Sequence, residues 1–442
     1  MSVTSANAPF PSPAGAPAAP AQPPVSRKVV AAAVAGNAIE FYDFVTYAYF
    51  AVYIGQAFFP AKTPFMSLLL SVAVFGVGFI SRPLGGILIG AYADRAGRKP
   101  AMLLTIALIT VGTMGLALTP SYETIGIAAP IIVVLARLIQ GLALGGEVGP
   151  STSFLIEIAP PGKRGLYASW QLASQGLAAM VAGGVGMVMA ALLTTQQLHD
   201  WGWRVPFAVG LLLIPVALFL RKQMPETVEH GPHVDPTAPR ESAGTLLRRH
   251  SWILFLGTLI ILGGTVSTYV GTYMTTYAIA TLKMAPTVAL AATTMFGLST
   301  FVCSLLGGWL SDHYGRKTVM VIPRIALALL TYPAFLLLTH QPNLSTLLLA
   351  TALVGGMTGI SGAAGMAVVP ELLPLRVRAL GFAVVYAVGV SLFGGTTQLI
   401  VTWLIGVTGS PLAPAWYVAA TSVVCVIAML LIPESSKREL AR

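Results

Sequence analysis

Charged residues are scarce in this sequence. Asp, Glu, Lys and Arg make up 9% of its 442 residues, whereas they make up about a quarter of an ordinary soluble protein. No stretch is polar enough to fold as a separate globular domain, which excludes a soluble enzyme with a membrane anchor. Hydrophobic residues make up 56% of the chain, and the mean hydropathy is +0.80. The lipid bilayer is therefore the expected solvent for most of the chain.

The sequence also has few cysteines and no phosphate-binding loop motif. The two cysteines, Cys303 and Cys425, lie in apolar runs, which excludes a disulfide framework and gives no sign of a metal site. No G-x-x-x-x-G-K-[ST] sequence occurs, so ATP is not the expected energy source. Residues 1–26 contain seven prolines and no charge, and thus lack the basic start and apolar core of a signal peptide. We predict that they form a disordered cytoplasmic tail.

Twelve apolar runs follow this tail, separated by charged residues or by proline and glycine. A helix needs about 20 mostly apolar residues to cross a bilayer, and each run approaches or exceeds that length. We therefore predict an all-α integral membrane protein with twelve transmembrane helices in two groups of six. The first group covers 29–57, 66–93, 100–119, 125–156, 166–193 and 204–220, and the second covers 252–281, 287–311, 318–339, 344–371, 379–408 and 415–432.

The distribution of basic residues predicts the domains and their orientation. If the N-terminus is cytoplasmic, 19 of the 25 lysines and arginines fall on the cytoplasmic side, so both termini are predicted to lie there, in a cell (inner) membrane. The net charge of +10 then reflects orientation and not nucleic-acid binding. The predicted parts are a tail (1–26), a six-helix bundle (27–221), a cytoplasmic linker (222–250), a second six-helix bundle (251–433) and a second tail (434–442).

The two halves carry the same loop pattern. Residues 90–99 read GAYADRAGRK after the second helix, and residues 308–317 read GWLSDHYGRK after the eighth. Such an internal repeat is typical of transporters built from two related halves. Each loop aspartate is expected to face a neighbouring helix N-terminus, where the helix dipole favours a negative charge. The loop and helix-end charges expected to form gates are Asp94, Arg98, Glu147, Glu157, Arg164, Asp312, Arg316, Glu371 and Arg378.

The doubled G-x-x-x-D-x-x-G-R-K loop resembles the signature of the major facilitator superfamily, and the resemblance extends from about residue 27 to 435. Residues 37–44 (NAIEFYDF), 82–86 (RPLGG) and 137–147 (RLIQGLALGGE) resemble its metabolite–proton symporter branch. Shorter strings, such as residues 201–207 (WGWRVPF), are similar to citrate and tricarballylate carriers. The resemblance implies two six-helix halves with inverted repeats, alternating access between the two sides, and no cofactor other than the coupling proton.

Six ionisable residues lie within the predicted helices. A charge at that depth costs at least about 2.5–3.5 kcal/mol, so it is expected to face a cavity or to be paired. Glu40 and Asp43 are three residues apart on one helical face, and two close carboxylates in a low dielectric favour protonation of one of them. We predict that one of the two carries the coupling proton; the alternative is a structural ion pair with Arg82 or Arg137. The other two deep charges are Glu147 and Arg324.

Arg137 is the leading candidate for substrate contact, because a buried guanidinium can bind a carboxylate through two parallel hydrogen bonds. A permanent pair with a helix 1 acid is the alternative. Arg324 either reaches the cavity or extends to the cytoplasmic surface, and Arg82 fits helix packing equally well. Other polar residues either line the cavity or hold helices together. The predicted substrate-binding residues are Asn37, Tyr47, Arg82, Arg137, Gln140, Gln171, Ser174, Gln175, Arg324, Thr397 and Gln398.

The sequence thus predicts a transporter and not an enzyme: a proton-coupled symporter that imports an organic polycarboxylate such as citrate or a related tricarboxylate. Symporters of the same branch for 2-oxoglutarate, shikimate, proline or betaine are the alternatives, and a transceptor that senses its substrate without moving it is an alternative of another class. Several deep arginines argue against a drug–proton exporter. The expected partners are a small organic anion, protons and lipid, with no nucleic acid and no metal, and the protein is expected to be a monomer.

Overall fold

The computed structural model describes residues 27–96, 98–145, 148–222 and 243–436. Within these residues the chain is helical, with one short 3-10 turn and no strand. The first half contains α1 (Arg27–Tyr49), α2 (Ala51–Phe58), α3 (Pro64–Ile80), α4 (Arg82–Ala96), α5 (Arg98–Leu118), α6 (Tyr122–Ile125), α7 (Ala128–Gly145), α8 (Val148–Glu157), α9 (Arg164–Leu192), α10 (Thr195–Asp200), η1 (Gly202–Arg204) and α11 (Val205–Lys222). The second half contains α12 (Ala243–Arg249), α13 (Ser251–Ala280), α14 (Pro286–Tyr314), α15 (Arg316–His340), α16 (Leu344–Leu372), α17 (Leu375–Thr408) and α18 (Ala413–Leu431).

These helices form a multi-pass membrane protein whose spans match the predicted twelve. Nine helices of the described residues are long and apolar enough to cross a bilayer, and shorter apolar helices cover Leu103–Leu118 and Gly202–Val216. The first predicted span, 29–57, is formed by α1 and α2, which are separated at Phe50. It contains two acidic residues, Glu40 and Asp43.

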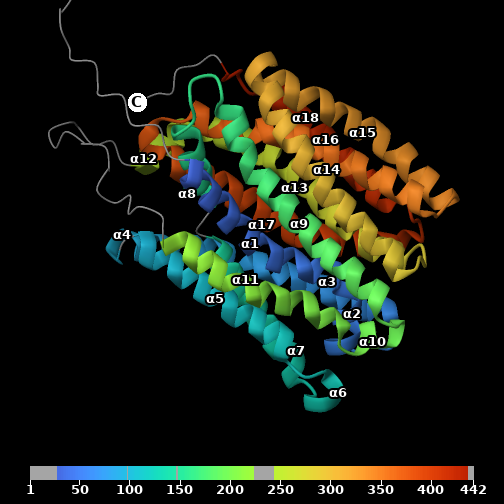
Figure 1. Ribbon diagram of the computed structural model, residues 1–442. Coiled ribbons are helices and arrows are strands. Elements are labelled where there is room, and N and C mark those ends of the chain that lie inside the picture. Colours follow the sequence, from blue (N-terminus) through green and yellow to red (C-terminus); the bar gives the residue numbers. More distant parts are fainter. Residues whose placement is uncertain (1–26, 97, 146–147, 223–242, 437–442) are drawn as a thin grey trace, which may run out of the picture.

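Two groups of helices lie side by side, with the helices from α1 to α11 in one group and those from α13 to α18 in the other (Figure 1). They meet along two seams, where α9 lies along α14 and α3 lies along α17. Both seams are tight at glycine: a Cβ atom on Gly297 would lie 2.1 Å from the backbone nitrogen of Met180, and one on Gly76 would lie 2.4 Å from the carbonyl oxygen of Gly395. The halves therefore touch backbone to backbone.

A third close crossing, between α7 and the break from α3 to α4, positions the site. A Cβ atom on Gly141 would lie 1.8 Å from the carbonyl oxygen of Gly78, and one on Gly145 would lie 1.9 Å from that of Arg82. Ser81, at the break, donates its hydroxyl to the carbonyl oxygen of Leu138 at 2.8 Å. Because no side chain separates these backbones, Arg82 and the arginine of α7 are held on adjacent helices.

Some predicted boundaries differ from the structure. The predicted linker 222–250 contains the helix α12, and the predicted helix 125–156 begins at Ala128 and corresponds to α7 and α8, between which residues 146–147 lie outside the described residues. The predicted tail 1–26 and linker residues 223–242 lie outside the described residues.

The two ends of the bundle are named as follows. The basic end is the end at which α1, α9 and α15 begin, and the far end is the end at which α3 and α14 begin.

Candidate substrate and proton site

Two arginines of the first half lie on one cluster of aromatic rings. Arg137 of α7 is fully buried, and its guanidinium carbon lies 4.6 Å from the ring centroids of both Phe44 and Tyr47. Arg82, the first residue of α4, lies 4.5 Å from the same Phe44 ring and 4.1 Å from the Phe79 ring. The two cations thus share one ring, and cation–π contacts hold two positive charges next to each other.

Each of these guanidinium groups has nitrogen atoms that no described residue binds. Nη1 of Arg137 donates to Oε1 of Gln140 at 2.7 Å, whereas its Nε and Nη2, and likewise Nε and Nη2 of Arg82, are buried without a hydrogen-bond partner. Neither arginine forms an ion pair with a carboxylate of the described residues. Because an unpaired buried charge is costly, this arrangement suits an anionic ligand with more than one carboxylate.

Asp43 is connected to Arg137 through Gln140 and not directly. Nε2 of Gln140 donates to Oδ2 of Asp43 at 2.5 Å, and the hydroxyl of Thr113 on α5 donates to the same oxygen. Oδ1 of Asp43 is buried without a partner among the described residues and faces α11 at Gly210. A direct ion pair of Asp43 with an arginine, the structural alternative from the sequence, is therefore not formed among the described residues. The carboxylate and the guanidinium are instead the two ends of one hydrogen-bonded chain.

Three predicted site residues bind one another and join α1 to α9. Nδ2 of Asn37 donates to Oγ of Ser174 at 2.6 Å, and Nε2 of Gln171 donates to Oδ1 of Asn37 at 3.1 Å. Mutually bonded polar groups of this kind stabilise helix contacts in a membrane, which favours the packing interpretation for these three side chains. Glu40 lies one turn before Asp43 on α1 and is also buried.

Tyr47, Thr397 and Gln398 are bonded within the protein as well. The hydroxyl of Tyr47 donates to a backbone carbonyl of α3 at 3.2 Å while its ring lies against Arg137. Thr397 donates to a carbonyl one turn earlier in its own helix. Nε2 of Gln398 donates to Oγ1 of Thr272 on α13 at 3.2 Å. The structure thus brings only Tyr47 of these three into contact with the arginine pair.

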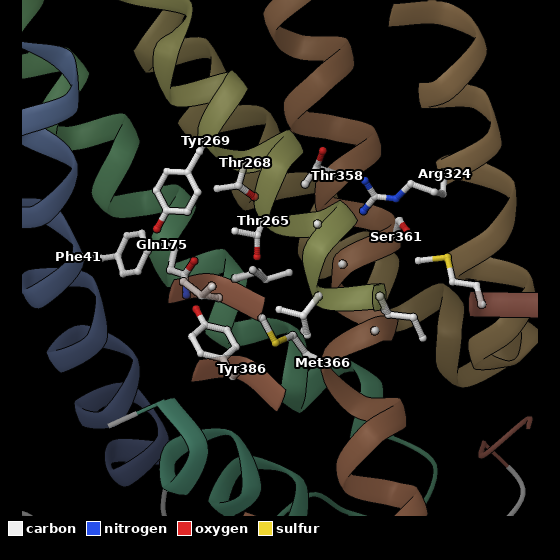
Figure 2. Close-up of a pocket in the computed structure, with 18 residues that line it drawn as sticks. Phe41, Gln175, Thr265, Thr268, Tyr269, Arg324, Thr358, Ser361, Met366 and Tyr386 are labelled. Atoms are coloured by element: carbon white, nitrogen blue, oxygen red, sulfur yellow. The ribbon is translucent and has the colours of Figure 1, made fainter. Parts of the chain in front are cut away.

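A cavity in the second half reaches Arg324 of α15 (Figure 2). Phe41 of α1 and Gln175 of α9 line its side toward the first half, together with Tyr269 and Tyr386. Gln175 has a buried Nε2 atom without a partner among the described residues. Arg324 is fully buried, so the alternative in which it extends to the membrane surface is wrong. Its guanidinium group donates to Gly263 and Ser267 of α13.

The basic end is closed by contacts between the halves. Oδ1 of Asp312 accepts from the backbone N–H of Gly165 at 2.8 Å, and its Oδ2 accepts from that of Leu166 at 2.9 Å. These N–H groups belong to the first turn of α9, so the aspartate binds a helix N-terminus of the other half, as the loop pattern predicts. Nη1 of Arg316 donates to Oδ1 of Asp312 at 2.7 Å.

Two further ion pairs belong to this end. Arg316 binds Glu371 through two parallel bonds, from Nε to Oε2 at 3.2 Å and from Nη2 to Oε1 at 2.9 Å. Nη1 of Arg378 donates to Oε1 of Glu157 at 3.3 Å, across the boundary between the halves. Arg164 begins α9. Glu147 and the side chains of Asp94 and Arg98 lie outside the described part of the chain.

The end of α18 is attached to the same cluster through Glu434. Its carboxylate accepts from the backbone N–H of Arg316 at 3.0 Å and from that of Lys317 at 2.9 Å, at the N-terminus of α15. Partial burial acts to raise the pKa of Glu434, but the backbone N–H groups of Ser436, Lys317 and Arg316 outweigh it and lower the pKa to about 2. The carboxylate therefore stays charged at neutral pH and holds the chain after α18 against α15.

The far end is closed too. A Cβ atom on Gly406 of α17 would lie 2.3 Å from the ring of Phe65 at the start of α3. The hydroxyl of Thr276 on α13 donates to the carbonyl oxygen of Ala48 on α1 at 3.3 Å. The halves therefore touch at the far end as well as at the basic end.

Several residues of the site were not predicted from the sequence. Thr113 binds the predicted proton carrier, and Phe44, Phe75 and Tyr269 form the aromatic surface under the arginines. A threonine or a phenylalanine in an apolar helix gives no signal by itself, because such residues occur throughout a membrane protein. Only the position of Thr113 opposite Asp43 in space distinguishes it from the other threonines.

Two six-helix groups that enclose buried, partly unpaired charges and touch at both ends define a membrane transporter. Family comparisons agree: the family described as "Sugar (and other) transporter" matches residues 28–235, and that described as "Major Facilitator Superfamily" matches residues 278–441. The chain belongs to the major facilitator superfamily, whose members are transporters and not enzymes.

Within this superfamily, the chain is similar to transporters of organic acids and of proline or betaine. The chain is 35% identical to a citrate-proton symporter of Klebsiella pneumoniae over 89% of this chain and 88% of that one. It is 34% identical to an alpha-ketoglutarate permease of Escherichia coli (92% and 94% covered) and 31% identical to a proline/betaine transporter of Salmonella typhimurium (94% and 85% covered). The crystal structure of a D-xylose-proton symporter has the same fold, with a TM-score of 0.73, 17% identity, and 93% and 98% of the two chains covered. The predicted fold and family are thus confirmed.

Proposed function

We propose that this transporter is a proton symporter for an organic polycarboxylate of the citrate class. The observation that carries the proposal is the pair Arg82 and Arg137, with four buried guanidinium nitrogens that no described residue binds. Two or more carboxylates of one ligand would supply the missing acceptors and neutralise both cations. The relatives named as citrate-proton symporters, at 35% and 36% identity, support the same substrate class.

A zwitterion such as betaine fits these contacts less well. Its quaternary ammonium group would need free aromatic faces, whereas the rings of Phe44, Tyr47 and Phe79 are in contact with the two arginines. Its single carboxylate would also leave one of the two guanidinium groups without an anion. We therefore favour a di- or tricarboxylate over proline or betaine.

Coupling to protons is proposed to act through the chain from Asp43 to Arg137. When Asp43 is protonated it no longer offsets the positive charge of the arginines, so the attraction of the site for an anion increases. By linkage, a bound anion then favours the protonated acid by the same factor. The connecting group is Gln140, which donates to the carboxylate and accepts from the guanidinium. Glu40 is the second candidate for the proton carrier.

Alternating access is proposed to use the two closed ends as gates. The excess of lysine and arginine at the basic end favours a cytoplasmic position for that end. Opening it would break the contacts of Asp312 with α9 and of Arg378 with Glu157, because these join the two halves. Each net positive charge carried inward through 100 mV contributes about 2.3 kcal/mol, so the membrane potential drives import only if more protons than anionic charges enter.

The test is transport by purified protein in liposomes with an imposed inward proton gradient. We expect labelled citrate to accumulate above its external concentration, and a protonophore to abolish the accumulation. Labelled 2-oxoglutarate and betaine are measured in parallel in the same vesicles. Uptake of betaine without uptake of either carboxylate would overturn the proposed substrate class, and citrate binding without any transport would favour a transceptor.

A further inference from the structure

Arg324 is a buried cation of the second half without an acidic partner among the described residues. Nη1 donates to the carbonyl oxygen of Gly263 at 3.1 Å and to the hydroxyl of Ser267 at 2.9 Å, both on α13. Its Nε atom is buried and has no hydrogen-bond partner, and no carboxylate of the described residues pairs with the group. The side chain is 0% exposed. Neutral dipoles alone thus compensate a full positive charge inside the bundle, which is an expensive arrangement.

The side chain of Arg324 borders the cavity, and the cavity extends from it to the first half (Figure 2). Figure 2 shows the guanidinium group beside Thr358 at one end, and Phe41, Gln175 and Tyr269 toward the other. Besides the arginine, the walls carry polar atoms without partners, namely Oγ1 of Thr358 and Nε2 of Gln175. The cavity therefore has a cationic end and donors along its length.

The opposite end of this cavity adjoins the arginine pair of the first half. The ring of Tyr269 lines the cavity and lies 5.2 Å from the ring of Phe79, on which Arg82 rests at 4.1 Å. Tyr269 and the Gly263 carbonyl bound by Arg324 are six residues apart on α13, a rise of about 9 Å. This rise separates two positions on α13 at the cavity, with Arg324 bound at one and the Tyr269 ring, beyond which Phe79 and Arg82 lie, at the other.

We propose that Arg324 forms a carboxylate subsite of its own, which receives one carboxylate of a substrate whose other carboxylates bind Arg82 and Arg137. This inference rests on the proposed function and extends it. The substrate then contacts both halves of the protein, and selection among substrates depends on their number of carboxylates. A tricarboxylate satisfies all three cations. A dicarboxylate leaves Arg324 without its anion and gains nothing from it.

The experiment compares two ligands that differ in one carboxylate, propane-1,2,3-tricarboxylate and glutarate. Their affinities for the purified full-length protein are measured by calorimetry or by competition against labelled citrate. In the Arg324→Gln variant we expect affinity for the tricarboxylate to fall by about 10- to 100-fold, as for loss of a charged hydrogen bond, while affinity for glutarate changes by less than about twofold. An equal loss for both ligands, or no loss for either, overturns the proposal.

A second variant leaves Arg324 in place, in case its removal prevents folding. Thr358→Asp puts a carboxylate in the cavity beside the guanidinium, and this internal anion should compete with the substrate's own. We expect the same selective loss of tricarboxylate affinity, and unchanged affinity for both ligands overturns the proposal. The control is Arg204→Gln, which removes an arginine that donates to two backbone carbonyls at the far end and should leave both affinities unchanged.

These outcomes separate the subsite from the proposed function. If the wild-type protein binds neither ligand, the proposed substrate class fails. A different outcome is that the wild-type protein binds the tricarboxylate, and that Arg137→Lys weakens this binding whereas Arg324→Gln does not. That result supports substrate binding at Arg82 and Arg137 and disproves the subsite at Arg324.

Discussion

Arg316 at the basic end and Arg137 at the centre are both buried arginines, but their guanidinium groups differ in how they are paired. Every guanidinium nitrogen of Arg316 has a partner, from Glu371, Asp312 and Ser311. Arg137 has one partner, Gln140, and two nitrogens without any among the described residues. A fully paired cation holds parts of a protein together, whereas an incompletely paired one favours binding of an anion. Pairing, and not burial, therefore separates the closing contacts from the candidate substrate site.

The strongest test of this comparison is Arg137→Lys. A lysine keeps the charge but loses the planar fork and the contact with Gln140. We expect citrate affinity to fall by about 100-fold or more, in the range for loss of one partner of a buried charge pair, with a small change in thermal stability. Binding is measured by calorimetry on the purified protein. Unchanged affinity would remove Arg137 from the substrate site.

The next effect concerns coupling. Asp43→Asn resembles the protonated acid and cannot release a proton, so accumulation of citrate driven by a proton gradient should be lost. Exchange of internal for external citrate needs no net proton movement and should remain. Both activities are measured in the same liposomes, with Glu40→Gln as the matched variant one turn away. Loss of gradient-driven uptake in Glu40→Gln alone would assign the proton to Glu40.

Arg316→Gln tests the other side of the comparison. The substitution leaves Glu371 and Asp312 without their cation, and breaking a buried ion pair costs about 3–5 kcal/mol. We expect a clear fall in the unfolding temperature of the purified protein, with citrate affinity of the folded protein within about threefold of the wild type. A variant of normal stability that has lost citrate binding would place Arg316 with the substrate site and end the distinction.

The smallest expected effect is at Glu434. Its pKa of about 2 lies below the ordinary 4.5, so its carboxylate contributes stability above pH 4.5 that is lost as the pH falls toward 2. In Glu434→Gln the unfolding temperature should therefore fall less over this pH interval than in the wild type. Because Glu434 is exposed, the difference should be small. Identical pH profiles for the two proteins would contradict the role of the α15 N-terminus in holding this carboxylate.

Much of the fold was predictable because hydropathy and charge placement act over short stretches of chain. The apolar runs predicted the spans, and the doubled loop pattern predicted the position of Asp312 at a helix N-terminus. Candidate charges could also be selected, because an ionisable residue in a membrane helix is rare. Which of them are paired could not be predicted. Asn37, Gln171 and Ser174 look like cavity residues in the sequence, yet they bind one another.

The sequence by itself determined the bilayer as solvent, the helical spans and the short set of deep charges, because these depend on composition and on spacing along one helix. Only the tertiary structure decided that Gln140 and not an ion pair connects Asp43 to Arg137, that both arginines share the Phe44 ring, and that Arg324 stays buried beside a cavity. These contacts join residues far apart in the chain. Their geometry depends on how closely glycine lets the helices approach, which no single helix encodes.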